Sequence, residues 1–102
     1  MNTTTISNTD KNFVIITYDI VKNKHRNRVM KVLKGIGFHV QKSVFECFLN
    51  DCQLDALKIR LSSEIDDRYD GIRFYKLHGA AAAEVDIVGV GEVAENQQLI
   101  II

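Results

Sequence analysis

The stretch NFVIITYDI, from Asn12 to Ile20, determines how the rest of the chain is interpreted. It is short, rich in β-branched and aromatic residues, and apolar at both alternating sets of positions. These features predict a central strand that is covered on both faces. The carboxylate of Asp19 lies near the end of the stretch, where the chain is expected to leave the sheet.

Helix and strand patterns alternate after this first strand. Residues 22–35 are predicted to form a helix, because Val29, Leu33 and the following Ile36 recur at helical spacing, with Asn23 as the expected N-cap. Further strands are predicted at 38–41, 43–49, 72–77 and 85–93, a second helix at 50–65, and a helical turn at 80–83. The order β-α-β-β-α-β with an extra C-terminal strand predicts an α+β, ferredoxin-like antiparallel sheet with two helices on one face.

The second predicted helix has a start signal as well as an apolar face. Asn50 and Gln53 have the spacing of a capping box, in which each side chain binds the backbone N–H of the other residue. The apolar face consists of Leu54, Leu57, Leu61 and Ile65.

The length of 102 residues fits a single domain. We expect a flexible leader at 1–11, the ferredoxin-like domain at 12–94, and an apolar tail at 95–102 that packs on a partner chain. No signal peptide or membrane-spanning apolar run is visible in the sequence. Two cysteines, Cys47 and Cys52, are too few for a disulfide framework. These features predict a cytoplasmic protein with reduced thiols and no membrane association.

The net charge of zero conceals a segregation of charge along the chain. Residues 20–45 contain seven Lys or Arg residues, two His and no acid, whereas residues 46–102 contain eleven acids and five Lys or Arg. Within the first helix, Lys24, Arg28, Lys31 and Lys34 recur at helical spacing opposite the apolar face. This pattern indicates a basic surface for an anionic partner, although a solvated helix face without a partner has the same composition.

Four motifs occur in order along the folded part of the chain. They are Tyr18-Asp19-Ile20, Arg26-Asn27-Arg28, Gly37, and the segment QKSVFE from Gln41 to Glu46. Together they resemble the CRISPR-associated protein 2 family, small metal-dependent nucleases or scaffolds of spacer adaptation in CRISPR antiviral defence. The resemblance extends over roughly Phe13 to Val90.

This resemblance implies a homodimer in which the C-terminal strand of each chain joins the sheet of the other. It implies that Asp19 faces its counterpart across the dimer axis as the catalytic and metal-binding residue, holding Mg²⁺ or, alternatively, Mn²⁺. The implied partners are RNA or double-stranded DNA and the integrase called CRISPR-associated protein 1. Because Mg²⁺ needs only one or two carboxylates, a pair of Asp19 side chains would suffice, but a single chain offers no second carboxylate near Asp19 in sequence.

The same resemblance assigns nucleic-acid contacts to Arg26 and Arg28, with Lys24 and Lys31 on the same helix. Tyr18, Ser43 and Phe45 are expected to support the motif. The sequence departs from the family pattern at His25 and His39, where relatives carry arginine or another basic residue. Since histidine is mostly neutral near pH 7, these changes predict weaker or more pH-dependent phosphate binding. No aromatic platform for stacking bases is evident, so we expect electrostatic binding that is indifferent to base sequence.

Each candidate residue also has a structural interpretation. Asp19 could cap a helix or close a turn, Arg26 and Arg28 could lie on a solvated face, and Phe45 could simply pack in the core. Ser43 has no apparent base to activate it as a nucleophile, and the histidines do not have zinc-ligand spacing.

Three functions are compatible with these residues. The first is a Mg²⁺-dependent endonuclease that hydrolyses phosphodiester bonds of RNA or duplex DNA through the Asp19 pair. The second is a non-catalytic scaffold that binds duplex DNA and bridges the integrase. The third, outside the family, is a ferredoxin-like regulatory module that binds a small ligand, which fold alone permits.

Overall fold

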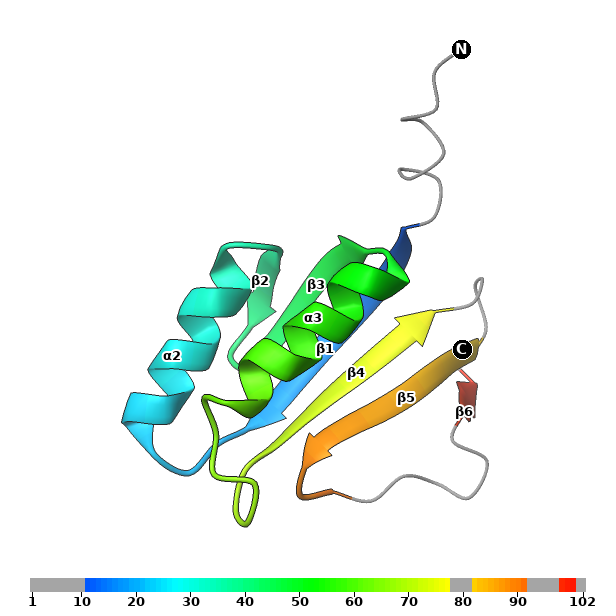
Figure 1. The fold of residues 1–102 in the computed structure, drawn as a ribbon. Helices are drawn as coiled ribbons and strands as arrows, with labels where there is room; N and C mark the ends of the chain where they lie inside the picture. Colours follow the sequence, from blue (N-terminus) through cyan, green and yellow to red (C-terminus); the bar gives the residue numbers. More distant parts are fainter. Residues whose placement is uncertain (1–10, 78–81, 92–97, 101–102) are drawn as a thin grey trace.

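A computed structural model of the chain describes residues 11–77, 82–91 and 98–100. Within these residues the chain forms eight elements, shown in Figure 1. They are β1 (Asn12–Asp19), α2 (Asn23–Lys34), β2 (Phe38–Gln41), β3 (Val44–Leu49), α3 (Asp51–Ser62), β4 (Gly71–Leu77), β5 (Ala82–Gly89) and β6 (Gln98–Ile100).

The strands form one antiparallel sheet in the order β2-β3-β1-β4-β5-β6. Both helices lie on the same side of this sheet (Figure 1), which we call the helix-covered face. The first four strands have the order of the ferredoxin-like arrangement, and β5 and β6 extend it at the β4 side. The predicted fold class is therefore confirmed.

The core lies between the sheet and the two helices. Ile16 of β1 stands opposite Phe45 of β3 and Phe74 of β4, and all three side chains are buried. Val29 and Leu33 of α2 complete one side of the core, as their helical spacing predicted. Leu54, Leu57 and Leu61 of α3 complete the other side.

No helix of the described residues lies on the opposite side of the sheet, and we call it the uncovered face. Phe13, Ile15 and Thr17 of β1 alternate with the buried residues of that strand and are only half-buried. β1 is central, as predicted, but the prediction that it is covered on both faces is wrong for a single chain. The apolar side chains on its second face are available for other contacts.

The helix starts are built differently. At α3 the predicted capping box is confirmed: the Gln53 N–H donates to Asn50 Oδ1 at 2.7 Å, and the Asn50 N–H donates to Gln53 Oε1 at 2.9 Å. At α2 the N-cap is Lys22, not Asn23, and no side chain caps it. The Asn23 carboxamide oxygen instead accepts a hydrogen bond from the guanidinium of Arg26.

The C-terminal part of the sheet differs from the sequence prediction. Ala82 and Ala83 open β5 and are not part of a helical turn, while residues 80–81 lie outside the described residues. Pairing with β4, from Leu77↔Ala83 to Gly71↔Gly89, outweighs the helix propensity of alanine. β5 also ends at Gly89, and Val90 and Gly91 are not part of it, because Gly89 adopts φ +88°, which breaks the strand. Residues 92–93 of the predicted strand lie outside the described residues.

Two parts of the predicted organisation concern the chain ends. Of the expected leader, only Lys11 belongs to the described residues. Of the expected apolar tail, 98–100 form β6, which pairs with β5 of the same chain. Packing of the tail on a second chain stays a prediction. Across the described ranges, no helix is long and apolar enough to span a membrane.

The two cysteines provide a test of the core. Cys47 is 2% exposed and its thiol lies 3.8 Å from the carbonyl oxygen of Val14, and burial raises the pKa of the Cys47 thiol to about 11. Cys52 is exposed at the start of α3. Because the thiolate is the reactive form, iodoacetamide at pH 8 should label Cys52 in the native protein and both cysteines in denaturant. Mass spectrometry measures the labelling.

The control is Cys52→Ser, which should leave the native protein unlabelled under the same conditions. Equal labelling rates of Cys47 and Cys52 in the native wild-type protein would contradict the described packing of β3.

Candidate nucleic-acid and metal-binding sites

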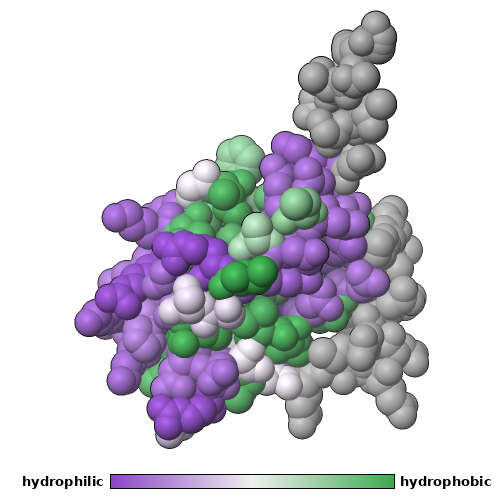
Figure 2. All heavy atoms as spheres, viewed as in Figure 1, coloured by the Kyte–Doolittle hydropathy of each residue, from purple (hydrophilic) through white to green (hydrophobic). Residues whose placement is uncertain are grey.

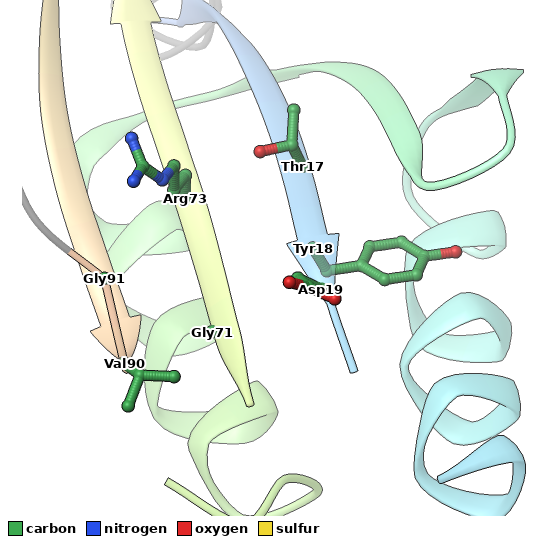
Figure 3. Close-up of a pocket in the computed structure, with 7 residues that line it drawn as sticks. All are labelled: Thr17, Tyr18, Asp19, Gly71, Arg73, Val90 and Gly91. Carbon is green, nitrogen blue, oxygen red and sulfur yellow. The ribbon is translucent and has the colours of Figure 1, made fainter. Parts of the chain in front are cut away.

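Asp19 lies at a hollow on the uncovered face, at the end of β1 (Figure 3). The hollow has a volume of about 270 Å³. The side chain of Asp19 is exposed and makes no hydrogen bond or ion pair with any other described residue. Since Lys22 is the N-cap of α2, Asp19 does not cap that helix. We call this site the Asp19 hollow; its lining residues are Thr17, Tyr18, Asp19, Gly71, Arg73, Val90 and Gly91.

Arg73 is a lining residue that the sequence analysis missed. It stands directly opposite Thr17 in the β1–β4 pairing, and the Asp19↔Gly71 pair lies two positions further along. In an antiparallel pair, residues two positions apart share a face, so the register brings the guanidinium of Arg73 to the side of Asp19. The signal in the sequence was the Asp70-Gly71 turn, which fixes where β4 begins.

Tyr18 and Asp19 are adjacent in the motif but serve opposite faces of the sheet. The Tyr18 side chain is 7% exposed and packs in the core, and Figure 3 shows its ring pointing toward α2, away from Thr17 and Arg73. This follows from the alternation of side chains along a strand. The structure therefore separates the motif into an acidic part on the uncovered face and an aromatic part on the helix-covered face.

The described residues of one chain contain no group of three or more His, Cys, Asp or Glu side chains that could hold a metal ion. Asp19 supplies one suitable ligand, because Mg²⁺ binds carboxylate oxygens and retains several waters. Among the described residues that line the hollow, Asp19 is the one carboxylate, so the hollow as described offers Mg²⁺ a single carboxylate ligand.

The basic residues of α2 point in two directions. Arg28 and Lys31 are exposed and line a groove toward α3, together with Arg60 and Glu64. Arg26 is half-buried on the other side of the helix, where it faces the β2–β3 hairpin. The structure does not bring Arg26 and Arg28 together, because residues two apart on a helix lie on nearly opposite sides.

The outer surface of α2 carries the predicted basic face. Lys24, Arg28, Lys31 and Lys34 are all exposed. Figure 2 shows hydrophilic side chains gathered over the part of the surface formed by α2. In the described part of the chain, no acidic residue lies within α2 to offset these charges.

A second hollow, which we call the Tyr18 cleft, lies between α2 and the β2–β3 hairpin. It brings together three predicted residues, Tyr18, Arg26 and Ser43, with His39 and Lys42. Phe45 lies below it in the core and is 1% exposed. The β2–β3 register places His39 opposite Phe45, and their rings are stacked at a centroid distance of 4.6 Å. That the chain has no aromatic platform for stacking bases stays a prediction.

The buried carboxylate of Asp70 ties together the loops around both hollows. Its oxygens accept hydrogen bonds of 2.9 Å from the N–H of Val21, before α2, and of Asp66, after α3. The Asp70 carbonyl accepts a bond of 2.8 Å from the N–H of Val90, after β5. His25 Nδ1 lies 3.7 Å from Asp70 Oδ2, so His25 faces inward toward Asp70 and not toward a ligand at the surface.

Close backbone packing at this end of the sheet requires glycine. A Cβ atom on Gly71 would lie 2.0 Å from the carbonyl oxygen of Val90, and one on Gly89 would lie 2.0 Å from the carbonyl oxygen of Asp70. These approaches bring β4 and the end of β5 together beneath the Asp19 hollow.

Comparison with known proteins identifies relatives over most of the chain. The family model described as CRISPR associated protein Cas2 matches residues 12–85. A protein of Chloroflexus aurantiacus named CRISPR-associated endoribonuclease Cas2 3 is 46% identical over 81 residues, which cover 79% of this chain and 87% of the relative. A Halalkalibacterium halodurans protein named CRISPR-associated endonuclease Cas2 is 37% identical over 81 residues, covering 74% and 84%.

Solved structures agree with this result. The crystal structure of Streptococcus pyogenes Cas2 matches with a TM-score of 0.61 and 37% identity, covering 65% of this chain and 86% of that one. A hypothetical protein from Thermus thermophilus matches with a TM-score of 0.65 and 34% identity, covering 81% and 96%.

The hydrogen bonds of Asp70 can be tested by substitution. Asp70→Ala leaves the N–H groups of Val21 and Asp66, whose hydrogen bonds are part-buried, without this acceptor, and should lower the free energy of unfolding by about 2–3 kcal/mol. Urea denaturation followed by circular dichroism measures the change. Asp67→Ala removes an exposed carboxylate from the same loop and should change the stability by less than about 0.5 kcal/mol. Equal stabilities of the two variants would show that Asp70 does not organise these loops.

Proposed function

The chain belongs to the CRISPR-associated Cas2 family, and we propose that it acts as a homodimeric, Mg²⁺-dependent endonuclease on the phosphodiester backbone of RNA or duplex DNA. The observation that carries this proposal is the Asp19 carboxylate, which is exposed, has no partner among the described residues, and lines a hollow together with Arg73. The names endoribonuclease and endonuclease on its relatives support a nuclease activity.

Each residue of the Asp19 hollow has a chemical task in this proposal. Two Asp19 carboxylates, one from each copy, would hold the metal ion, which supplies Lewis acidity and a more acidic bound water. The guanidinium of Arg73 has the geometry to bind two phosphoryl oxygens and to offset the negative charge that develops during cleavage. Thr17 and the backbone near Gly71 shape the hollow around the reacting phosphate.

The uncovered face supports association of two copies. Apolar residues of β1, β3 and β4 lie half-buried on it, and Phe48 is 59% exposed. Burying such a surface against a second copy is favourable by about 25 cal/mol per Å² of apolar area removed from water. In that arrangement the two Asp19 side chains lie on the faces that meet, as the metal site requires. The half-buried apolar side chains are Phe13, Ile15, Val44 and Leu77.

A second candidate function is a non-catalytic scaffold that binds duplex DNA and bridges the integrase of spacer adaptation. One observation favours it: the basic face of α2 lies on the helix-covered side of the sheet, away from the Asp19 hollow. Phosphate binding by Lys24, Arg28 and Lys31 therefore does not need Asp19. The two functions make different predictions for the same substitution.

The endonuclease proposal predicts the effect of Asp19→Asn. This change keeps the shape of the side chain and removes the charge that binds the metal, so Mg²⁺-dependent cleavage should fall by at least about 100-fold. The measurement is gel electrophoresis of labelled RNA and duplex DNA with Mg²⁺ or with EDTA. Asp55→Asn makes the same change at an exposed position of α3 and should cleave like the wild type.

Full Mg²⁺-dependent cleavage by Asp19→Asn would exclude the carboxylate-pair mechanism. If the wild type and Asp19→Asn both bind duplex DNA and neither cleaves RNA or DNA, the scaffold is the correct function.

The basic face of α2 predicts the salt dependence of duplex binding. Removing one phosphate contact with Lys24→Ala or Arg28→Ala should reduce the slope of log K against log salt by about one unit. Fluorescence anisotropy with labelled duplex DNA at several salt concentrations gives the slope. Arg68→Ala is the control, because Asp66 already neutralises Arg68 with an ion pair of 3.0 Å. Unchanged slopes for both α2 variants would place the phosphate contacts elsewhere.

A further inference from the structure

The position of the Asp19 carboxylate depends on the backbone that carries it. The side chain is exposed, and no hydrogen bond or ion pair with another described residue holds it. The β1–β4 pairing ends at the Asp19↔Gly71 pair, so Asp19 is the last residue of β1 that the sheet itself holds. Because the ends of secondary-structure elements fray at little cost, a carboxylate at this place keeps a fixed direction only if the chain beyond it is held as well.

Asp70 holds the chain around the Asp19 hollow. Its Oδ1 accepts a hydrogen bond of 2.9 Å from the N–H of Val21, the second residue after Asp19. Its carbonyl oxygen accepts a bond of 2.8 Å from the N–H of Val90, which lines the hollow (Figure 3). Gly71, another lining residue, follows Asp70 directly in the chain. One residue thus connects the exit of β1, the start of β4 and the chain after β5.

The carboxylate of Asp70 is engaged by the protein and does not line the hollow. The residue is 1% exposed. Its second oxygen, Oδ2, accepts a bond of 2.9 Å from the N–H of Asp66 and lies 3.7 Å from Nδ1 of His25. A buried carboxylate whose two oxygens already accept hydrogen bonds is not available to a metal ion in the hollow. Any effect of Asp70 on metal binding therefore acts through Asp19.

We propose that Asp70 is the positioning residue of a metal site at Asp19. It holds the end of β1 so that the Asp19 carboxylate keeps the direction that metal binding needs, and it keeps Val90 and Gly71 in place beside that carboxylate. Residues that orient a metal ligand without touching the metal typically change metal affinity by about 10- to 100-fold when they are replaced. The proposal rests on the proposed function, since it presumes that Asp19 binds Mg²⁺.

The test measures the binding of Mn²⁺, as a probe for Mg²⁺, by electron paramagnetic resonance. Asp70→Asn keeps the size of the side chain, but a carboxamide has one acceptor oxygen and an NH₂ group that donates. The N–H groups of Val21 and Asp66 then lose one of their two acceptors, so we expect Asp70→Asn to bind Mn²⁺ about 10- to 100-fold more weakly. Cleavage should need correspondingly more Mg²⁺ and should approach the wild-type rate when Mg²⁺ is saturating.

Two control variants separate positioning from changes in charge and in stability. Asp67→Asn removes the same charge from an exposed position of the same loop and should bind Mn²⁺ like the wild type. Leu57→Ala removes buried apolar volume from α3, so it should lower the urea midpoint and leave the Mn²⁺ affinity of the folded protein unchanged. Circular dichroism shows whether each variant is folded under the binding conditions. Asp70→Ser, which keeps one hydroxyl acceptor, replaces Asp70→Asn if the latter does not fold, with the same expected loss of affinity.

The outcomes separate this proposal from the proposed function. Wild-type Mn²⁺ affinity in folded Asp70→Asn overturns the positioning role and leaves the proposed function standing. An equal loss in Leu57→Ala also overturns it, because lower stability would then explain the effect. If Asp19→Asn binds Mn²⁺ as tightly as the wild type, the metal is not held by Asp19 and both proposals are wrong. Mn²⁺ binding that depends on Asp19 and Asp70 in a protein that cleaves neither RNA nor DNA supports the positioning role and overturns the endonuclease.

Discussion

The buried carboxylate of Asp70 is the constraint on which both hollows depend. A carboxylate away from water is costly unless its oxygens are hydrogen-bonded, and here they are bonded to the N–H groups of Val21 and Asp66. The Asp70 carbonyl binds Val90 in addition. The start of α2, the loop after α3 and the end of β5 must therefore meet at one point. That meeting point sets where Arg26 enters the Tyr18 cleft and where Val90 closes the Asp19 hollow.

Strand alternation explains why one motif makes two sites. Tyr18 and Asp19 are neighbours in the chain, yet a pleated strand sends neighbouring side chains to opposite faces. The aromatic residue therefore joins the helix-covered face, with Phe45 and Arg26, and the acid joins the uncovered face, with Arg73. The two faces are consequently separable by substitution, although Tyr18 and Asp19 are adjacent in sequence.

Sequence patterns among neighbouring residues predicted the helices and strands well. The features that the sequence analysis missed depend on the pairing register between strands that are distant in the chain. The strand at 12–20 and the Asn50 capping box depend on residues close in sequence, and both appear nearly as expected. The place of Arg73 and the His39–Phe45 ring contact depend on which residues face each other across β1–β4 and β2–β3, which periodicity does not specify. Because β1 has apolar residues on both faces, we predicted that both faces would be covered. In the described residues of one chain, the helices cover only one face of β1.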